Sequence, residues 1–369
     1  MEKAKQQFED ILAQLDITLN GDNPWDIQIN DPRCFERWYN QGSLGFGESY
    51  VDGWWDCDKL DELVSRLLRE RIERKFITPG IVLTFFKAKL INRQSINRST
   101  KVAEIHYDLG NEFYEHMLDE NMQYTCAYWK DASNLNEAQI AKLDLVCKKL
   151  KLKPGERILE LGSGWGGFAY HAAKNYGVEV VSYNISKEQV DWAKRRCKDL
   201  SVSFQLEDYR NATGEFDKIA SVGLMEHVGP KNYQPFMALA DRCLKDDGLL
   251  LVHTIGRRST VNLCDPWIDK YIFPGGVLPS IKAIGEACED YFVIEDLHNI
   301  GPDYDLTLLA WYANFEKSWP MLKDQYSEHF YRMWRYYLLI CAGSFRSRNN
   351  QLWQIVFSKG VDGGYVPVR

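Results

Sequence analysis

The sequence predicts an α/β protein in which a doubly wound parallel sheet follows a smaller helical module. Two patterns support this prediction. Short apolar runs alternate with helix-like segments after residue 150, and roughly the first 75 residues repeat apolar side chains at helical spacing. At 369 residues the chain is long enough for two domains and a substantial core.

A glycine-rich turn lies in the run Arg157–Ala173, around which the rest of the chain is organised. The run has a buried strand, a turn and a helix in order: 158–161, 162–167 and 168–173. Glycine permits positive φ and leaves room for a ligand on the backbone. Trp165 stands where a dinucleotide's pyrophosphate would need space, so the turn suits S-adenosylmethionine better than NAD. The alternative is a tight turn with nothing bound.

Two amphipathic patterns in the N-terminal part indicate helices, one near Phe8–Leu15 and one at Leu60–Leu68. Residues 66–101 then hold ten Lys or Arg and two Glu, interleaved with bulky apolar side chains. This mixture is typical of an interfacial element that meets anionic lipid. A solvated basic helix beside a buried one explains it equally well. Residues 92–100 are polar and indicate a linker.

Composition excludes several classes of protein. The net charge of -7 argues against a nucleic-acid binder, while 45% apolar and 26% charged residues are typical of a globular protein. No run is apolar enough to span a bilayer, and the first residues lack a signal-peptide core, so we expect a cytoplasmic protein. The nine Cys are scattered and should be free thiols. The His spacing predicts no metal site. Twelve Trp suggest an aromatic-lined cavity or an aromatic-rich core.

From residue 134 the chain alternates between predicted helices and strands. Asn134 begins a helix, with Glu137 at the capping-box position, and Pro154 ends it. The predicted strands that follow are 158–161, 178–183, 202–206, 216–222, 249–255, 292–297 and 306–311. Helices are predicted at 187–197 and 233–244, and an insertion at about 257–284. Such alternation is typical of a parallel sheet covered on both faces.

Seven motifs between residues 103 and 346 share one family resemblance, and the resemblance covers nearly the whole chain, including the N-terminal module. They are AEIHYDLGNEFY at 103–114, YTCAYW at 124–129, LELGSGWGG at 159–167, MEHVGPKNY at 225–233, HTIG at 253–256, DYD at 303–305 and CAGSFR at 341–346. Together they resemble the cyclopropane-fatty-acyl-phospholipid synthases and, more distantly, the mycolic acid cyclopropane synthases. Ser163 departs from the Cys of many relatives, but the two side chains are isosteric.

The resemblance implies a doubly wound seven-stranded class I methyltransferase (Rossmann-like) domain at 103–369. A helical lipid- or membrane-docking domain at 1–85 and a linker at 86–102 would precede it. The implied reaction transfers a methylene group from S-adenosylmethionine to the cis double bond of a phospholipid acyl chain. The alkene attacks the sulfonium methyl, a carbocation-like centre forms, and a base removes a proton as the ring closes. The site must therefore be dry, with aromatic faces near the cation.

The resemblance also implies the cofactor residues. Glycines of the turn hold the methionine side, and side chains after the second and third strands hold the ribose and adenine. Tyr124 and Thr125 would close over the methionine end. The implied set is Tyr124, Thr125, Gly162, Gly164, Gly166, Asn184, Gln189, Asp208 and Tyr209. Asn184 stands where other methyltransferases usually carry an acid. Asp208 alone could instead be a solvated loop acid.

For the base, the family resemblance implies a bound bicarbonate held by Cys126, Glu226, His253, the backbone of Ile255, and Tyr304. Glu226 and His253 follow the fourth and fifth strands, at the edge where ligands bind in such sheets. Taken alone, His253 could be a core histidine and Glu226 a helix N-terminal acid. Cys341 belongs to the same implied active site. No neighbouring His or Lys in the sequence would activate it as a nucleophile, so we expect it to line the acyl pocket.

Aromatic residues that could face the cation, or simply fill the core, are Tyr271, Phe273, Trp311, Tyr336 and Tyr337. The expected protein is a peripheral enzyme on the inner face of the cell membrane, with unsaturated phospholipid as its partner. A homodimer is implied by resemblance alone. The alternatives are a small-molecule N-methyltransferase on the same fold and a non-catalytic lipid-binding protein.

Overall fold

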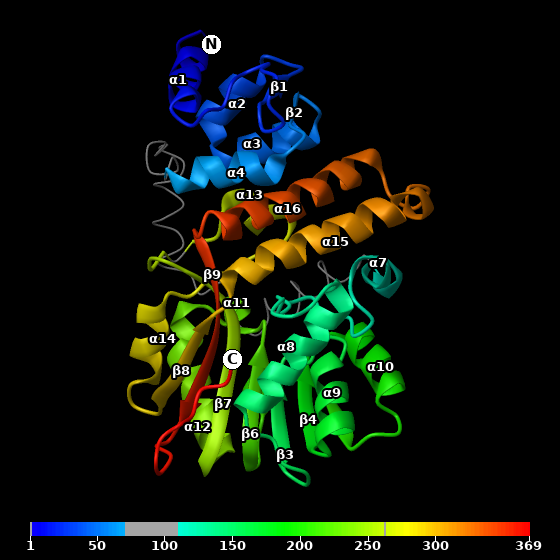
Figure 1. Ribbon diagram of the computed structural model, residues 1–369, viewed down its shortest axis with the longest axis vertical. Coiled ribbons are helices and arrows are strands. Elements are labelled where there is room, and N and C mark those ends of the chain that lie inside the picture. Colours follow the sequence, from blue (N-terminus) through cyan, green and yellow to red (C-terminus); the bar gives the residue numbers. More distant parts are fainter. Residues whose placement is uncertain (1, 71–109, 262) are drawn as a thin grey trace. The chain divides into compact units, whose positions relative to one another are not determined.

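The predicted parallel sheet is present in the computed structural model, which describes residues 2–70, 110–261 and 263–369 (Figure 1). Within these ranges the sheet has seven strands in the order β5-β4-β3-β6-β7-β9-β8. The strands are β3 (Arg157–Leu161), β4 (Glu179–Asn184), β5 (Val202–Leu206), β6 (Phe216–Val222), β7 (Leu244–Arg257), β8 (Val293–Asn299) and β9 (Asn350–Ser358). The five strands β3 to β7 pair in parallel, so their carboxyl ends share one edge.

Helices cover both faces of this sheet, as the alternating pattern predicts. They are α7 (Gly110–Met117), α8 (Leu135–Lys149), α9 (Gly167–Tyr176), α10 (Lys187–Arg196), α11 (Met225–Val228), α12 (Tyr233–Cys243) and α14 (Ile281–Cys288), with short 3-10 turns at η2 (Tyr209–Asn211) and η3 (Pro230–Asn232). Along β3, Ile158 packs into one core cluster with side chains of α8, α9 and α10. Leu159 and Leu161 pack into a second cluster with α12 and α14. Successive side chains of β3 therefore point to opposite faces of the sheet and pack into the helix layers on both sides.

The predicted start of α8 is confirmed. The Asn134 side chain accepts a hydrogen bond from the Glu137 N–H at 3.0 Å, which satisfies one of the free donors at the helix N-terminus. The Glu137 carboxylate reaches back to the Ser133 N–H at 2.9 Å. This cap fixes where α8 begins, and α8 supplies several of the buried polar side chains described below.

One strand prediction is wrong. Residues 306–311 lie within α15 (Gly301–Leu322), and the strand that pairs with β8 is β9. Buried residues of α15 recur at helical spacing, at Tyr304, Leu308, Trp311 and Phe315. The short apolar run suited either structure, and its longer helical context decided the outcome.

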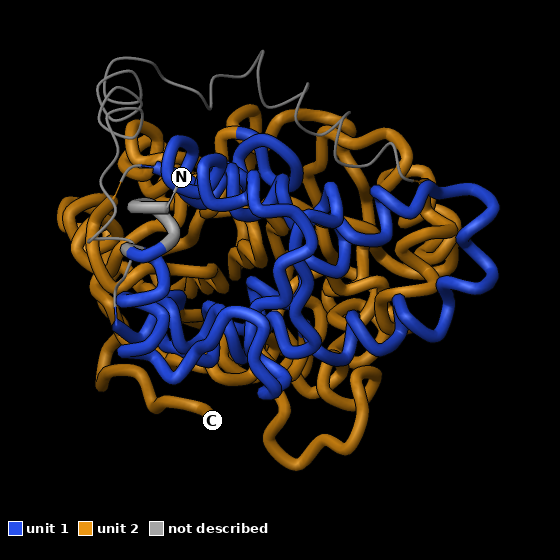
Figure 2. Tube along the Cα trace, turned by 90° about the horizontal axis from the view of Figure 1, so that it is seen from above, with its two compact units in different colours: residues 1–91, 263–274, 308–350 blue, residues 92–262, 275–307, 351–369 orange. Residues whose placement is uncertain are grey.

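A second compact unit is built from three separate stretches of chain. Figure 2 colours unit 1 (residues 1–91, 263–274 and 308–350) and unit 2 (residues 92–262, 275–307 and 351–369), the unit that holds the large sheet. Unit 1 contains α1 (Glu2–Ala13), β1 (Gln28–Ile29), α2 (Cys34–Gln41), α3 (Ser43–Val51), β2 (Trp55–Asp56), α4 (Leu60–Arg69), α13 (Pro266–Tyr271), most of α15, and α16 (Glu328–Arg346). β1 and β2 form a small antiparallel pair.

The predicted helices near Phe8 and Leu60 correspond to α1 and α4. The predicted linker at 86–102 and most of the basic stretch at 66–101 lie outside the described residues, so the predicted domain boundaries stay predictions. Across 2–70, 110–261 and 263–369, no helix is both long and apolar enough to cross a membrane.

Candidate active site

The glycine-rich turn joins β3 to α9 at the carboxyl edge of the sheet. Gly162, Gly164 and Gly166 all have positive φ, at 86°, 50° and 74°. A Cβ on Gly166 would lie 2.8 Å from the Ala193 Cβ and 2.9 Å from the Phe204 ring, so glycine is needed for close packing there. A Cβ on Gly164 would meet no atom of the described residues within 4 Å, so these residues leave the backbone at Gly164 open to a ligand.

Two predicted ribose-holding residues meet beside this turn. The Asn184 amide at the end of β4 donates to the Gly164 carbonyl at 3.0 Å and to the Gln189 Oε1 at 3.0 Å. Gln189 lies on α10 and is buried. Its Nε2 has no hydrogen-bond partner among the described residues. A buried amide donor next to an open glycine turn fits a ligand that carries hydroxyl groups.

Asp208 and Tyr209 follow β5, the neighbour of β4. The Asp208 carboxylate accepts a hydrogen bond from the Arg210 backbone N–H at 3.0 Å, forms an ion pair with the Arg210 guanidinium, and caps η2. It is therefore an ordered side chain and not a solvated loop acid. The Tyr209 ring packs edge-on against Phe236 at 5.9 Å, and burial raises the pKa of Tyr209 to about 12.

An aromatic group encloses the other side of the glycine-rich turn. The Tyr114 ring of α7 lies 5.3 Å from Tyr124 and 4.9 Å from Trp165, between ring centroids. The Trp165 indole donates to the Asn111 side chain at 2.7 Å. Tyr124, predicted to close over the methionine end, is thus connected to the turn through Tyr114.

Thr125 packs against the end of the adjacent strand. A Cβ added to Gly223, just after β6, would lie 2.6 Å from the Thr125 Cγ2. The segment of residues 121–127, which carries Thr125 and Cys126, therefore lies between the glycine-rich turn and the loop after β6. The predicted cofactor residues come from separate segments of chain and share this edge of unit 2.

Of the predicted acid–base residues, Glu226 follows β6, whereas His253 and Ile255 lie within the carboxyl-terminal part of β7. The Glu226 Oε1 on α11 accepts from the Ile255 N–H at 2.6 Å, so that backbone donor, expected to face the anion, is already engaged. The Gly223 N–H donates to the His253 carbonyl at 2.9 Å, which links the ends of the two strands. The Gln354 amide lies 3.3 Å from the His253 Nδ1.

Two atoms of this group lack partners. Neither the Glu226 Oε2 nor the His253 Nε2 has a hydrogen-bond partner in the part of the chain that the structure describes, although both atoms are buried. Burial raises the pKa of the Glu226 carboxyl to about 7. Burial, with the charges of Lys142 and Lys149, holds the pKa of His253 well below its ordinary value. A half-protonated acid and a neutral imidazole are therefore available at neutral pH.

Cys126 lies in the segment before α8, and Tyr304 lies on α15. The Cys126 thiol donates to the Ala127 carbonyl at 3.2 Å, and the Ala127 N–H donates to the Thr307 hydroxyl at 3.1 Å. Tyr304 lies one turn before Thr307 and is buried. Burial raises the pKa of the Cys126 thiol well above its ordinary value, so this sulfur is a neutral thiol and not a thiolate nucleophile.

Comparison with known proteins decides the family. Residues 94–355 match the family described as mycolic acid cyclopropane synthetase. A cyclopropane-fatty-acyl-phospholipid synthase from Escherichia coli (strain K12) is 51% identical over 96% of this chain and 93% of its own length. The chain belongs to this family of cyclopropane synthases.

Other relatives agree with this assignment. A probable fatty acid methyltransferase from Pseudomonas putida is 34% identical over 74% of the chain and 73% of its own length. The solved structure of the cyclopropane synthase MmaA2 from Mycobacterium tuberculosis is similar with a TM-score of 0.66 and 30% identity, covering 70% of this chain and 97% of that one. As a cyclopropane synthase, the protein is an S-adenosylmethionine-dependent methyltransferase with the class I fold.

The remaining predicted residues of this cyclopropane synthase lie in unit 1. Cys341 is on α16, and burial raises the pKa of its thiol to about 12. The aromatic candidates of unit 1 pack in ring contacts: Phe273 lies 6.0 Å from Tyr337, and Tyr336 lies 4.6 Å from Trp267, a further tryptophan outside the predicted set, between centroids. The role of these residues in holding an acyl chain stays a prediction.

Sequence reasoning missed three buried polar residues next to the site: Gln123, Gln139 and Lys142. A signal for two of them was present. Gln139 and Lys142 stand at helical spacing among apolar residues, in a pattern that includes Ala138 and Leu143. A lysine on an apolar helix face is rare unless it is paired, and it could have been singled out for that reason.

Proposed function

We propose that the protein transfers a methylene group from S-adenosylmethionine to the cis double bond of an unsaturated phospholipid acyl chain and forms a cyclopropane ring. The observation that carries this proposal is the 51% identity, over nearly the full chain, to a relative named for that reaction. Two observations support it: the buried Glu226 Oε2 and His253 Nε2 have no hydrogen-bond partner among the described residues, and Gly223, against which Thr125 packs, donates to the His253 carbonyl.

S-adenosylmethionine, when bound, supplies an electrophilic methyl group on a sulfonium. The glycine-rich turn would hold its methionine side, and the Asn184–Gln189 pair would hold the ribose hydroxyl groups. Asp208 and Tyr209 would contact the adenine. The turn fits a ligand without phosphate, because the buried Trp165 side chain follows Gly164 directly. The segment carrying Tyr124 and Thr125 would exclude water from the methyl group.

We further propose that bicarbonate, when bound, supplies the base. Two neighbouring anions would repel each other, but the raised pKa of Glu226 lets this carboxyl carry a proton and donate to the anion. His253 and Tyr304 would orient the anion from the other elements. The Cys126 thiol would serve as a donor. Removal of a proton from the transferred methyl group would then close the ring and end the carbocation stage. Water must be excluded from the site during that stage.

Membrane contact also belongs to this proposal. An olefin buried in a bilayer must reach the site, and the basic and apolar stretch at 66–101 is the segment suited to anionic lipid. Peripheral association and a homodimer stay predictions. An amine-methylating enzyme would need no base of this kind, and a non-catalytic lipid-binding protein would not turn over.

The test is to incubate the purified protein with S-adenosylmethionine, bicarbonate and liposomes of monounsaturated phospholipid. Mass spectrometry should show acyl chains heavier by one CH2, and their resistance to hydrogenation of double bonds should distinguish a ring from a branched alkene of the same mass. Glu226→Gln should abolish turnover and still bind S-adenosylmethionine.

The matched control is Glu179→Gln, an exposed carboxylate at the amino end of β4, which should turn over normally. Unchanged liposomes with wild-type protein that binds the cofactor would overturn the proposed function. Loss of both turnover and binding in Glu226→Gln would mean that the role given to Glu226 is wrong.

A further inference from the structure

Helix α8 carries two fully buried lysines, Lys142 and Lys149. The reaction described above uses neither. Lys149 lies 3.3 Å from Asp296, which also binds Arg369, so Lys149 belongs to an ion cluster under the C-terminus. Lys142 has a different environment, because its ammonium group hydrogen-bonds to neutral side chains of the segment at the cofactor edge.

The Lys142 Nζ donates to the Gln123 Oε1 at 2.5 Å and to the Thr125 Oγ1 at 2.9 Å. From the preceding turn of α8, the Gln139 Nε2 donates to the Thr125 carbonyl at 2.8 Å and to the Gln123 carbonyl at 3.4 Å. Four hydrogen bonds thus run from one face of a rigid helix to residues 123 and 125, which flank Tyr124. Hydrogen bonds from a charged donor are the stronger kind.

The same two residues pack tightly on the sheet. A Cβ on Gly167, at the start of α9, would lie 2.2 Å from the Gln123 Nε2, and a Cβ on Gly223 would lie 2.6 Å from the Thr125 Cγ2. Gln123 is therefore seated against the helix that begins at the glycine-rich turn, and Thr125 against the loop before Glu226. Lys142 fixes a segment that touches both halves of the site.

The bond to Thr125 also fixes its hydroxyl group. Because the oxygen accepts from an ammonium group, the hydroxyl hydrogen must point to some other acceptor. Asp119 completes the arrangement, since its carboxylate accepts from the N–H groups of Asn121 and Gln123, each at 2.8 Å. Asp119 and Glu160 also provide negative charge near the buried ammonium, which offsets part of its desolvation.

We propose that Lys142 is a positioning residue that holds residues 123–125 in the conformation that receives S-adenosylmethionine. This inference rests on the proposed function, in that Tyr124 and Thr125 are taken to contact the methionine end. Lys142 itself acts through Gln123 and Thr125 and would not touch the reacting atoms. Without it, the buried Gln123 side-chain oxygen and the half-buried Thr125 hydroxyl oxygen would lose their donor and the segment would rearrange.

The experiment compares Lys142→Met with Lys149→Met, two neutral replacements of equally buried lysines on one helix. Lys142→Met should bind S-adenosylmethionine about tenfold more weakly by calorimetry, because it removes charge-assisted bonds from the binding segment. Backbone amides of residues 119–129 should exchange hydrogen faster. Lys149→Met should lose stability in urea but keep wild-type affinity and wild-type exchange in 119–129, since Asp296 retains Arg369.

Equal affinities for Lys142→Met and wild type would overturn the inference, as would an equal loss of affinity in Lys149→Met. If Lys142→Met does not fold, Gln139→Met removes the two neighbouring bonds without a change in charge. It should weaken binding and speed exchange in the same segment, and wild-type behaviour would overturn the inference. These readouts need no lipid. A wild-type protein that binds the cofactor but makes no cyclopropane would defeat the proposed function alone.

Discussion

At the scale of single residues, burial of the Glu226 carboxyl group costs free energy. One carboxylate oxygen binds the Ile255 N–H, and the other has no partner among the described residues. Burial raises the pKa of Glu226 from an ordinary value of 4.5 to about 7. A carboxyl group whose pKa is raised in the folded state binds more protons there than in the unfolded state. Between pH 4.5 and about pH 7, ionisation of Glu226 therefore lowers the free energy of unfolding as the pH rises.

Glu226→Gln removes this ionisation. Relative to the wild type, its free energy of unfolding should rise by about 2 to 3 kcal/mol between about pH 4.5 and pH 7, and then level off. Urea denaturation of both proteins at a series of pH values, without bicarbonate or cofactor, measures this difference. Glu160, whose pKa is also raised to about 7, contributes to both proteins and cancels. A difference that does not vary with pH would contradict the assignment.

At the same scale, the sequence predicted the positions of the candidate site residues in the fold better than it predicted the buried residues that hold them. The predicted cofactor and acid–base residues could be placed at the carboxyl ends of strands, because strand order follows from alternation and local motifs. The bonds from Lys142 to Gln123 and Thr125 could not be predicted, since they depend on how a helix rotates against a distant segment. Ile255 is a second example: the resemblance implied that its backbone holds the anion, but its N–H donates to Glu226, and the sequence could not predict this bond.

At the scale of elements, β7 and β9 come into contact at a glycine. Gly256 lies near the end of β7, directly after Ile255, and a Cβ there would lie 1.8 Å from the Trp353 ring of β9. Trp353 is buried in the core cluster that includes α12 and α14. The position thus needs glycine for side-chain packing and not for backbone conformation. The need for glycine at position 256 could not be predicted from the sequence, because β9, the strand that carries Trp353, was not predicted.

Gly256→Ala should therefore destabilise the protein by about 1 to 3 kcal/mol through overpacking, measured by urea denaturation. Gly285→Ala is the matched control. Gly285 lies within α14, and a Cβ there would meet no atom within 4 Å in the part of the chain that the structure describes, so alanine should stabilise the helix by about 0.5 to 1 kcal/mol. Trp353→Leu should recover part of the loss in the Gly256→Ala background. No recovery would mean that the ring is not the cause.

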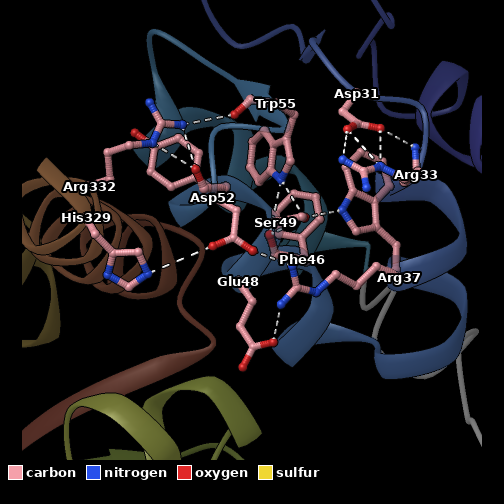
Figure 3. A network of polar contacts seen from close by, with 12 residues as sticks. Asp31, Arg33, Arg37, Phe46, Glu48, Ser49, Asp52, Trp55, His329 and Arg332 are labelled. Atoms are coloured by element: carbon pink, nitrogen blue, oxygen red, sulfur yellow. Dashed lines mark hydrogen bonds and ion pairs between the residues drawn. The ribbon is translucent and has the colours of Figure 1, made fainter.

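At the scale of the whole molecule, unit 1 is assembled from stretches that lie far apart in the sequence. The Glu48 carboxylate of α3 accepts from Arg37 at 2.5 Å, from Lys270 at 2.6 Å and from the Tyr271 hydroxyl at 2.8 Å. Arg332 of α16, which is labelled in Figure 3, donates to the Tyr50 carbonyl and to Asp56. Helical periodicity predicted α1 and α4, but it carries no information on which distant segments join them.

Several of these ions line a polar cavity of about 230 Å3 within unit 1. Its lining residues are Arg37, Glu48, Val51, Asp52, Trp267, Lys270, Tyr271, His329 and Met333. Arg37 bridges Glu48 and Asp52, and Lys270 binds Glu48, so these charges are largely paired with one another. We therefore interpret the cluster as the contact that joins the three stretches.

Glu48→Gln tests this interpretation through the pH dependence of stability. Burial alone would raise the pKa of Glu48, but its bonds to Lys270, Tyr271 and Arg37 lower it to about 2. A lowered pKa contributes stability that is complete above about pH 4.5 and is lost as the pH falls through about 2. Glu48→Gln should therefore destabilise the protein by roughly 2 kcal/mol at pH 7, and the difference should shrink toward pH 2.

Asp31→Asn, which removes an exposed local pair with Arg33, should leave the free energy of unfolding unchanged. If both variants behaved alike, Glu48 would be an ordinary surface ion and the three stretches would be joined by apolar packing alone.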